Sequence, residues 1–412
     1  MNKRACRFCS HPLTQSVVDL GMLPLSNSYI KDDQLKCIEP FYPLQAFVCD
    51  SCFLVQLEGI ESPEHIFKDY AYFSSYSDTW LQHARVYADY IVARLGLLHS
   101  DKTVIEIASN DGYLLQYFKA KGVHVIGIEP AANVAEAAMK KGIPTEVRFF
   151  GRDLAGELVR QGKRADLIVG NNVLAHVPDL NDFVAGMKTL LKPDGVITME
   201  FPHLMHLIAE SQFDTIYHEH IFYFSFITVE KVFARHGFTL FDVEELPTHG
   251  GSLRIYARHI EDSDKEATPN VSGLREKESR FGLDGLGTYP VFAEKVKETK
   301  QNLLEFLIRA KQEGRVIVGY GAPAKGNTLL NYCGISTDFI DYTVDRNPHK
   351  QGLYLPGSHI PIRHPDRIKE TKPDYLLILP WNIKDEIMAQ MDFIRKWGGK
   401  FIVPIPKVEV LV

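Results

Sequence analysis

Strand-like and helical segments alternate from residue 103 to residue 201. Short runs rich in Val, Ile and Leu have the length and composition of buried strands, and amphipathic segments, several of them ending in glycine, separate these runs. The predicted strands cover residues 103–108, 123–129, 165–171 and 195–201, and the predicted helices cover 113–122, 133–142, 153–162 and 182–191. Such alternation implies parallel strands joined by right-handed crossovers, and therefore a doubly wound α/β sheet.

A second α/β pattern closes the chain. A long helical stretch, 291–314, leads to strand-like runs that are again separated by helical ones. These runs cover residues 316–322, 339–345, 374–380 and 401–406. The segment from about 261 to 290 carries charges, glycines and a proline, and we interpret it as an inter-domain connection. A chain of 412 residues is long enough for two or three domains.

Four of the six cysteines form two CxxC pairs near the start of the chain, Cys6/Cys9 and Cys49/Cys52. Each pair places two thiolates on one tight turn, and two such turns supply the four soft ligands that tetrahedral zinc prefers. A redox motif is the alternative, but it needs only one CxxC. We therefore predict a structural zinc site, although the spacing does not distinguish zinc from iron.

Composition excludes several classes of protein. No apolar run approaches the roughly 20 residues of a membrane span, and the first residues lead into no apolar segment of a secretory signal. A net charge of -6 without a basic stripe argues against nucleic-acid binding. We expect a soluble, cytoplasmic protein with small-molecule partners and no nucleic-acid or membrane partner. The oligomeric state is open, with a monomer as the expectation.

The ends of the predicted strands in the first α/β unit indicate a nucleoside-type cofactor. Ligands of doubly wound sheets bind at the carboxyl ends of the strands. Glu129 ends the second strand about 20 residues after the first, where a carboxylate can bind ribose hydroxyls. The first turn has the single glycine Gly112 and no G-x-G-x-x-G, so a dinucleotide pyrophosphate lacks its cradle. S-adenosylmethionine, which has a ribose and no phosphate, fits better than a dinucleotide, unless these residues are merely the polar ends of ordinary strands.

The stretch "YHEHIFYFS", Tyr217 to Ser225, interleaves two histidines and a glutamate with aromatic residues. Three explanations compete: a metal site, a structural polar cluster, and a general acid/base pair in an apolar pocket. In an extended strand His218 and His220 would share a face while Glu219 points away, and H-E-H is not the helical H-E-x-x-H zinc motif. A metal site is therefore disfavoured, and the other two explanations remain open from these residues alone.

Taken together and in order, the CxxC pairs, "EIASNDGYLL", "NNVLAHVPD", "YHEHIFYFS", "HGGSLR" and "YGAPAKGNTLLN" resemble the three-domain sugar C-methyltransferases that act on nucleotide-linked ketohexoses. The resemblance implies an α/β fold: a class I methyltransferase Rossmann-like domain flanked by a small zinc-binding domain and a C-terminal Rossmann-like domain. We expect these domains at residues 67–265, 1–66 and 266–412, respectively. The implied reaction is S-adenosylmethionine-dependent methylation of a dTDP-4-keto-6-deoxyhexose at C-3.

Such a reaction needs a base, because a sugar carbon becomes nucleophilic only when the proton next to a carbonyl is removed. Histidine has an ordinary pKa near the operating pH. The resemblance implies His220 as this base, with Glu219 and Tyr217 beside it. It also brings His176 toward the sugar, where this residue either polarises the keto oxygen or only packs.

The resemblance extends to the two binding sites. The residues expected at the cofactor are Glu106, Ala108, Asn110, Asp111, Gly112, Glu129, Pro130, Phe150, Asn171 and Asn172. Those expected at the sugar nucleotide are Tyr72, Tyr76, Ser252, Lys325 and Asn327, with Arg254 as a further candidate. Lys325 follows a glycine-rich turn at a predicted helix start, where backbone N–H groups and a lysine favour a diphosphate. An ordinary glycine-rich turn of the fold is the alternative there.

Three other functions compete with this prediction. An O- or N-methyltransferase would attack through a hydroxyl or amine and would need no carbon acid. A zinc-containing NAD-dependent oxidoreductase or epimerase could use the C-terminal α/β unit, although the missing G-x-G-x-x-G counts against it. A non-catalytic scaffold would bind neither the cofactor nor the sugar nucleotide.

Overall fold

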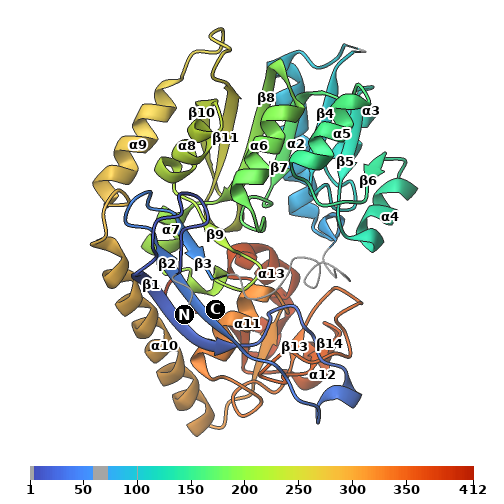
Figure 1. The fold of residues 1–412 in the computed structure, drawn as a ribbon. Coiled ribbons are helices and arrows are strands. Elements are labelled where there is room, and N and C mark those ends of the chain that lie inside the picture. The colour runs from blue at the N-terminus through green and yellow to red at the C-terminus, as the bar shows by residue number, and fades with distance from the viewer. Residues whose placement is uncertain (1–3, 59–72, 100) are drawn as a thin grey trace.

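The computed structural model describes residues 4–58, 73–99 and 101–412, and their strands form three sheets. In Figure 1 the largest sheet lies at the top and the C-terminal sheet, in orange and red, at the bottom. The blue N-terminal strands lie between them on the left. Among the described residues, no helix is long and apolar enough to cross a membrane.

The large sheet has seven strands in the order β10-β11-β8-β7-β4-β5-β6. Neighbouring strands from β6 to β8 are parallel, and β11 is antiparallel to both β8 and β10. The strands are β4 (Thr103–Ile107), β5 (His124–Ile128), β6 (Thr145–Glu146), β7 (Ala165–Asn171), β8 (Leu191–Pro202), β10 (Phe238–Leu246) and β11 (Ser252–His259). The predicted doubly wound sheet is confirmed, and the β10–β11 hairpin is an addition that the alternation did not predict.

Helices cover both faces of this sheet. They are α2 (Asp78–Leu95), α3 (Leu115–Ala120), α4 (Ala132–Lys140), α5 (Arg152–Arg160), α6 (Leu180–Leu190), α8 (Phe226–Arg235) and α9 (Pro269–Phe281), whereas the short helix α7 (Leu204–Ala209) packs into the core of the C-terminal unit. Helices α2 to α4 share one apolar cluster, and α5, α6, α8 and α9 share the other. The connection expected at 261–290 therefore contains a helix, α9, which packs against α8 and β10.

The chain crosses the sheet at one topological switch point. From β4 it moves outward to β5 and β6, and it then returns to the other side of β4 as β7 and β8. The carboxyl ends of β4 and β7 therefore border a crevice, which is the position where doubly wound sheets bind ligands.

The N-terminal sheet is antiparallel and has the order β1-β2-β3-β9. Its strands are β1 (Gln15–Leu23), β2 (Tyr42–Val48), β3 (Val55–Leu57) and β9 (Phe222–Tyr223). Because side chains alternate along a strand, Leu44 and Ala46 of β2 contribute to the core of the C-terminal unit while Phe47 contributes to the core of the large sheet. The N-terminal sheet therefore joins the two α/β units.

The C-terminal sheet has the order β14-β13-β12-β15-β16-β17, parallel except for the antiparallel β17. Its strands are β12 (Ile317–Tyr320), β13 (Thr343–Val344), β14 (Ile362–Arg363), β15 (Tyr375–Ile378), β16 (Lys400–Val403) and β17 (Glu409–Leu411). Its helices are α10 (Thr288–Gln312), α11 (Ala324–Cys333), α12 (Arg367–Thr371) and α13 (Lys384–Gln390). The strand order again reverses beside one strand, β12, whose carboxyl end leads into α11.

Tyr217 to His220 form a turn, and not the extended strand in which His218 and His220 would share a face. The His220 N–H donates to the Tyr217 carbonyl at 2.9 Å, which closes the turn. Ile221 follows and is held from two sides, since its N–H donates to the Ala175 carbonyl and its own carbonyl accepts from Leu57 N–H. The segment then enters β9, so the N-terminal sheet fixes the place of His220.

Candidate active site

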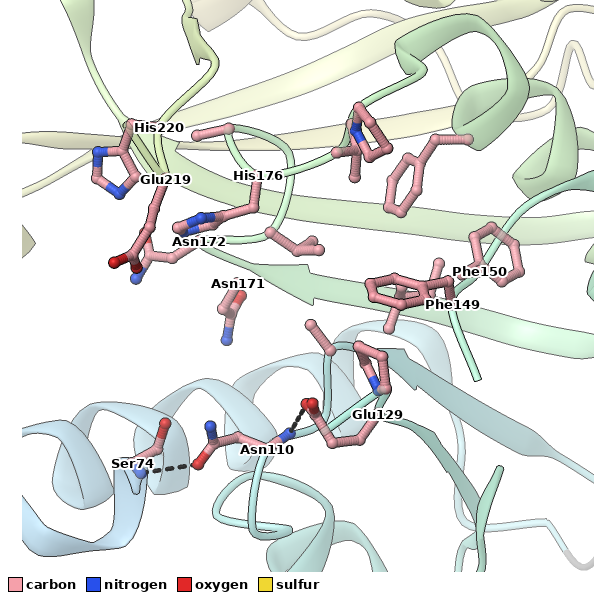
Figure 2. A pocket seen from close by; sticks show the side chains of 18 of the residues that line it. Ser74, Asn110, Glu129, Phe149, Phe150, Asn171, Asn172, His176, Glu219 and His220 are labelled. Atoms are coloured by element: carbon pink, nitrogen blue, oxygen red, sulfur yellow. Dashed lines mark hydrogen bonds between the residues drawn. The ribbon is translucent and has the colours of Figure 1, made fainter. Parts of the chain in front are cut away.

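A cavity of about 990 Å³ opens at the crevice of the large sheet. Residues from all three parts of the chain line it, including Asn27, Asn171, His220 and Lys325. Figure 2 shows Asn110 and Glu129 at one end and His176, Glu219 and His220 at the other, with Asn171 between them. Pockets for single small ligands usually measure about 300–1,000 Å³, so this cavity lies at the upper end of the range.

Glu129 and Asn110 are linked at the cavity end nearest β4. Oε2 of Glu129 accepts from the Asn110 N–H at 3.0 Å, and Oε1 accepts from the Ala131 N–H at 2.9 Å. Oδ1 of Asn110 accepts from the Ser74 N–H at 2.8 Å (Figure 2). Burial raises the pKa of Glu129 to about 7, although the two backbone N–H donors act against this rise. The ionised carboxylate retains lone pairs that can accept from two adjacent hydroxyls.

Residues with left-handed backbone are concentrated around the cavity. Ala108, Asn110, Asn172 and His249 have φ between 48° and 57°, and all four line it. Such values are uncommon for residues with a side chain and are found disproportionately at ligand sites. The loops after β4 and β7 are therefore held in shapes that serve the cavity.

Seven of the ten residues expected at the cofactor line the cavity: Ala108, Asn110, Glu129, Pro130, Phe150, Asn171 and Asn172. Glu106, Asp111 and Gly112 are not among the lining residues. Glu106 is fully buried, and burial raises its pKa well above the ordinary value. Asp111 is also buried and pairs with Lys141 at 3.0 Å. Gly112 has φ +75°, and a Cβ there would lie 3.0 Å from Ile143 Cγ1. These three residues support the loop from behind.

The cavity also has lining residues that the sequence did not indicate, among them Ser74, Trp80, Tyr113, Phe149 and His249. The Trp80 ring lies 5.8 Å from that of Tyr113 and 5.0 Å from that of His249, measured between centroids. Trp80 belongs to the first turn of α2. A tryptophan in a Tyr/Ser-rich stretch was the one available signal.

His220 is held in a single tautomer. Its Nδ1 lies 3.0 Å from the Thr215 carbonyl oxygen, which only accepts, so Nδ1 carries the proton. Nε2 therefore has the lone pair, and the Tyr217 hydroxyl donates to it at 2.8 Å. Burial and the neighbouring His176 keep the pKa of His220 well below its ordinary value. The imidazole is thus neutral at pH 7, with its basic nitrogen on the side of Tyr217.

His176 and Glu219 lie beside this base. The His176 and His220 rings meet edge to face, with centroids 4.7 Å apart. Burial lowers the pKa of His176 to about 4 and raises that of Glu219 to about 7. Glu219 Oε1 accepts from Asn27 Nδ2 at 2.6 Å, a contact from the N-terminal part that the sequence did not indicate. The four residues expected to be catalytic therefore lie together at one end of the cavity.

His218 lies apart from this group. Its Nε2 donates to the Pro43 carbonyl at 3.3 Å, and it is not among the residues that line the cavity. Within the described parts of the chain, no group of three metal ligands includes His218, Glu219 or His220.

The C-terminal unit contributes cations to the cavity. Lys325 and Lys350 both line it. The Lys325 ammonium donates to Asn382 Oδ1 at 2.8 Å and lies 4.7 Å from the centroid of the Trp381 ring. Burial lowers the pKa of Lys325. Before α11 the chain turns at Gly321, whose φ is +89° and where a Cβ would meet Pro380 Cδ at 2.6 Å.

Several residues expected at the sugar nucleotide lie elsewhere. Tyr72 lies outside the described residues. Tyr76 is 57% exposed, and its ring packs against Phe73. Asn327 is buried, and its Nδ2 donates to the Ser26 carbonyl at 2.5 Å. The Ser252 hydroxyl donates to the Thr248 carbonyl at 2.9 Å. Of the described candidates in this set, Lys325 alone is among the residues that line the cavity.

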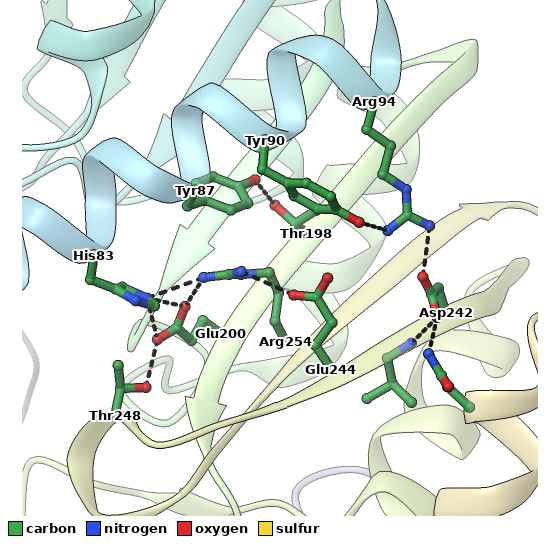
Figure 3. Close-up of polar contacts among 12 residues, drawn as sticks. His83, Tyr87, Tyr90, Arg94, Thr198, Glu200, Asp242, Glu244, Thr248 and Arg254 are labelled. Carbon is green, nitrogen blue, oxygen red and sulfur yellow. Dashed lines mark hydrogen bonds and ion pairs between the residues drawn. The ribbon is translucent and has the colours of Figure 1, made fainter.

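Arg254 belongs to a buried polar cluster behind the cavity wall (Figure 3). It pairs with Glu200 at 2.7 Å and with Glu244 at 3.1 Å. Burial acts to raise the pKa of Glu200, but His83 and Arg254 outweigh it and bring the value to about 2. The His83 ring stacks on Trp80 with centroids 5.0 Å apart. This cluster therefore supports the wall that carries Trp80.

The four cysteines of the two CxxC pairs lie together. Each offers a sulfur within 4.8 Å of the others, and the Sγ atoms of Cys6 and Cys52 are 3.6 Å apart. Those of Cys9 and Cys49 are 3.5 Å apart, and all four cysteines are free thiols. Four clustered thiols without a disulfide fit a closed tetrahedral zinc site of structural type. Such a site leaves no coordination position for chemistry.

Comparison with known proteins agrees with this geometry. The model of a "Methyltransferase domain" matches residues 79–243, a "Putative zinc binding domain" matches 6–67, and a "C-methyltransferase C-terminal domain" matches 247–406. The fold and site thus define an S-adenosylmethionine-dependent methyltransferase with a zinc-binding domain.

The chain is 35% identical over 406 residues to the C-methyltransferase NovU of Streptomyces niveus, covering 98% of this chain and 96% of that protein. It therefore belongs to the family of S-adenosylmethionine-dependent C-methyltransferases, as the sequence motifs predicted. The competing oxidoreductase and scaffold functions, and methylation of oxygen or nitrogen, are set aside by this membership.

Other relatives match one part of the chain. A ubiquinone biosynthesis O-methyltransferase of Rhodopseudomonas palustris (strain HaA2) is 30% identical over 100 residues, which cover 23% of this chain and 38% of that protein. The crystal structure of magnesium protoporphyrin IX methyltransferase from Synechocystis PCC 6803 with bound SAM is 14% identical. The match covers 49% of this chain and 99% of that one, with a TM-score of 0.36.

Proposed function

We propose that this C-methyltransferase acts on C-3 of a dTDP-4-keto-6-deoxyhexose, in the synthesis of a branched deoxysugar. The observation that carries the proposal is the tautomer of His220. Its Nδ1–H is fixed on the Thr215 carbonyl, and its basic Nε2 lies at one end of the cavity. A neutral imidazole in that position can remove a proton from a carbon acid.

His220 acts on the proton at C-3, which is acidic because C-4 carries the keto group. The proton moves to Nε2, and the electron pair of the C–H bond forms the enolate. In the structure the Tyr217 hydroxyl lies 2.8 Å from Nε2, and its position shows the direction in which the lone pair of Nε2 points. We place the sugar so that its C-3 hydrogen takes up this direction while the phenol turns to the enolate oxygen, where a hydrogen-bond donor stabilises developing charge.

His176 and Glu219 are proposed to orient the reacting groups. The neutral His176 ring lies edge to face with His220 and can donate a hydrogen bond to the keto oxygen. Glu219 is held by Asn27 at 2.6 Å, and its pKa of about 7 lets it accept from or donate to a sugar hydroxyl.

The other end of the cavity is proposed to hold the cofactor. When bound, S-adenosylmethionine supplies the electrophilic methyl group. Glu129 accepts hydrogen bonds from the ribose hydroxyls, while Phe149 and Phe150 provide apolar surface for the adenine. Asn171, the last residue of β7, and Asn172 directly after it lie between this end and His176.

Lys325 and Lys350 are proposed to bind the nucleotide diphosphate, since both line the cavity on the side of the C-terminal unit. A volume of about 990 Å³ is large for a single ligand and suits a cofactor and a sugar nucleotide together.

The first test compares two neighbouring histidines. We expect His220→Asn to lower kcat by about 10²- to 10⁴-fold, the usual contribution of a general base, with unchanged affinity for both ligands. His218→Asn is the matched control. It makes the same substitution in the same turn, but the side chain of His218 contacts Pro43 and does not line the cavity. The measurement is the mass of the product from S-adenosylmethionine and dTDP-4-keto-6-deoxyglucose.

A second measurement isolates the base. Incubation of the ketosugar in deuterium oxide with S-adenosylhomocysteine should introduce deuterium at C-3 with the unchanged protein and with His218→Asn, but not with His220→Asn. Equal exchange in all three proteins would refute His220 as the base. If the protein methylates a sugar nucleotide that has no exchangeable hydrogen at C-3, the proposed ketosugar substrate is wrong.

A further inference from the structure

A second group of metal-type ligands lies away from both the cavity and the four cysteines. It consists of His203, which directly precedes α7, His206 in α7, and Glu245 near the end of β10. One ligand atom of each lies within 4.8 Å of those of the other two. None of the three is among the residues that line the cavity, so the proposed methyl transfer leaves them unused.

Each histidine of this group has one ring nitrogen on a carboxylate. His203 Nε2 lies 2.6 Å from Oε1 of Glu278, and His206 Nδ1 lies 3.2 Å from Oε1 of Glu210. A carboxylate oxygen only accepts, so the ring nitrogen that faces it carries a proton. The lone pairs are therefore on His203 Nδ1 and His206 Nε2. A carboxylate on the far nitrogen is the usual arrangement of a metal-bound histidine, because it fixes the ring and raises its basicity.

The other ring nitrogen of each histidine is not engaged in a hydrogen bond to a described protein group. His203 is 1% exposed, and its Nδ1 is buried without a hydrogen-bond partner among the described residues. Leaving a buried polar atom without a partner costs free energy, so it calls for an explanation. His206 Nε2 lies 3.8 Å from Oε2 of Glu245, farther than a hydrogen bond.

We propose that His203 Nδ1, His206 Nε2 and the Glu245 carboxylate bind a divalent transition-metal ion. Two imidazoles and one carboxylate suit Zn²⁺, Co²⁺ or Ni²⁺, whereas Mg²⁺ and Ca²⁺ prefer an all-oxygen set. The side chains of His206 and Glu245 are 30% and 42% exposed, so an ion can enter from solvent and complete its shell with water.

Lys277 competes for the same carboxylate. Its ammonium lies 2.6 Å from Oε2 of Glu245, and its side chain is 45% exposed. Binding of an ion therefore exchanges a solvent-exposed ion pair for metal coordination. Exposed pairs contribute little, so this exchange is a small cost.

The ion would join elements that support the active site. His203 comes directly after Pro202, a lining residue, and its N–H donates to the Gly251 carbonyl at 3.0 Å. Gly251 lies two residues after His249, which lines the cavity, and Glu278 accepts from two N–H groups at the start of α8. The site thus lies behind the loop between β10 and β11 and would hold it in place.

The test uses the full chain with its cysteine site loaded with zinc, titrated with Co²⁺. We expect one further equivalent of Co²⁺ to bind, with weak visible bands and without the near-ultraviolet thiolate charge transfer that cobalt at the cysteines would give. His206→Ala and Glu245→Gln should lose this equivalent. His364→Ala, which removes an exposed histidine of the C-terminal unit, should retain it.

Two further variants change the affinity without touching a ligand. Glu210→Gln removes the partner of His206 Nδ1 and should weaken Co²⁺ binding by about 10- to 100-fold, the usual effect of an outer-shell partner. Lys277→Ala frees Glu245 and should tighten it. The proposal is wrong if the unchanged protein takes up no further equivalent, or if His206→Ala and Glu245→Gln bind Co²⁺ as His364→Ala does.

Discussion

The two α/β units share one architecture, but the side chains that they contribute to the cavity carry opposite charge. In each unit parallel strands reverse their order beside a single strand, β4 in one and β12 in the other. In each, the residues after that strand lead to the common cavity. The first crevice carries Glu129, a buried carboxylate, whereas the second carries Lys325 and Lys350.

The backbone of the two crevices differs as well. After β4, left-handed conformations fall on Ala108 and Asn110, where side chains are present and line the cavity. After β12, the left-handed position is Gly321, where Pro380 leaves no room for a Cβ. The fold thus sets the location of both sites, and the residues at the strand ends set the ligand: hydroxyls at a carboxylate, an anion at lysines.

Glu129→Gln gives the largest expected effect on this comparison. The amide presents one acceptor in place of a carboxylate, and hydrogen bonds to charged groups contribute about 1.5–3 kcal/mol. We expect the Kd for S-adenosylmethionine to rise by about 10- to 100-fold, with an unchanged Kd for the sugar nucleotide, by calorimetry. Glu146→Gln, at the end of β6 where the side chain pairs with Lys163, is the control and should change neither. Equal losses for both ligands would mean that the two crevices are not separate.

Lys325→Met is the converse test. Removing the ammonium should raise the Kd for the sugar nucleotide by about tenfold, at the lower end of the range for charged hydrogen bonds. The Kd for S-adenosylmethionine should stay the same. Lys311→Met, which removes a lysine paired with Asp341 on the same unit, serves as the control. If nucleotide affinity survives while kcat falls, Lys325 serves the reacting centre and not the diphosphate.

The parts of the site that were predictable from sequence are those at strand ends. Glu129, Asn171 and Asn172 follow runs that are unmistakably buried strands, and the fold brings such ends to one edge. Asn27 and His249 were not predictable in this way. They come from loops, and only the packing of the N-terminal sheet and the β10–β11 hairpin brings them to the cavity.

Polar residues within a motif were also hard to assign from the sequence. Asn327 and Ser252 belong to stretches that suggested ligand contacts, yet both are 1% exposed and bond to backbone carbonyls. A buried polar side chain must be paired, and sequence does not say whether its partner is a ligand or the protein itself. The turn at Tyr217–His220 was not predictable either, because the aromatic residues of this segment favour a strand. The turn depends on hydrogen bonds to the carbonyls of Thr215 and Ala175, which the sequence does not show.

The pH dependence of cofactor binding gives a smaller effect. Burial raises the pKa of Glu129 to about 7, so the free protein holds this carboxyl protonated below pH 7 and ionised above it. The ionised form is the better acceptor, so the Kd for S-adenosylmethionine should fall several-fold between pH 6 and pH 8. Glu129→Gln should have a flatter profile, which separates this group from titration of the ligand. A Kd that rises with pH in the unchanged protein would contradict the assignment.

Ser252→Ala should have the smallest effect and bears on which residues form the second crevice. The Ser252 hydroxyl donates to the Thr248 carbonyl at 2.9 Å and is buried, so the variant should lose about 1 kcal/mol of stability. The KM for the sugar nucleotide should change by less than about twofold, because the substitution causes only a small local repacking around Thr248. Thermal unfolding and steady-state kinetics measure the two quantities separately. A rise in KM comparable to that of Lys325→Met would mean that the β10–β11 turn closes onto the sugar nucleotide, and that the second crevice extends beyond the C-terminal unit.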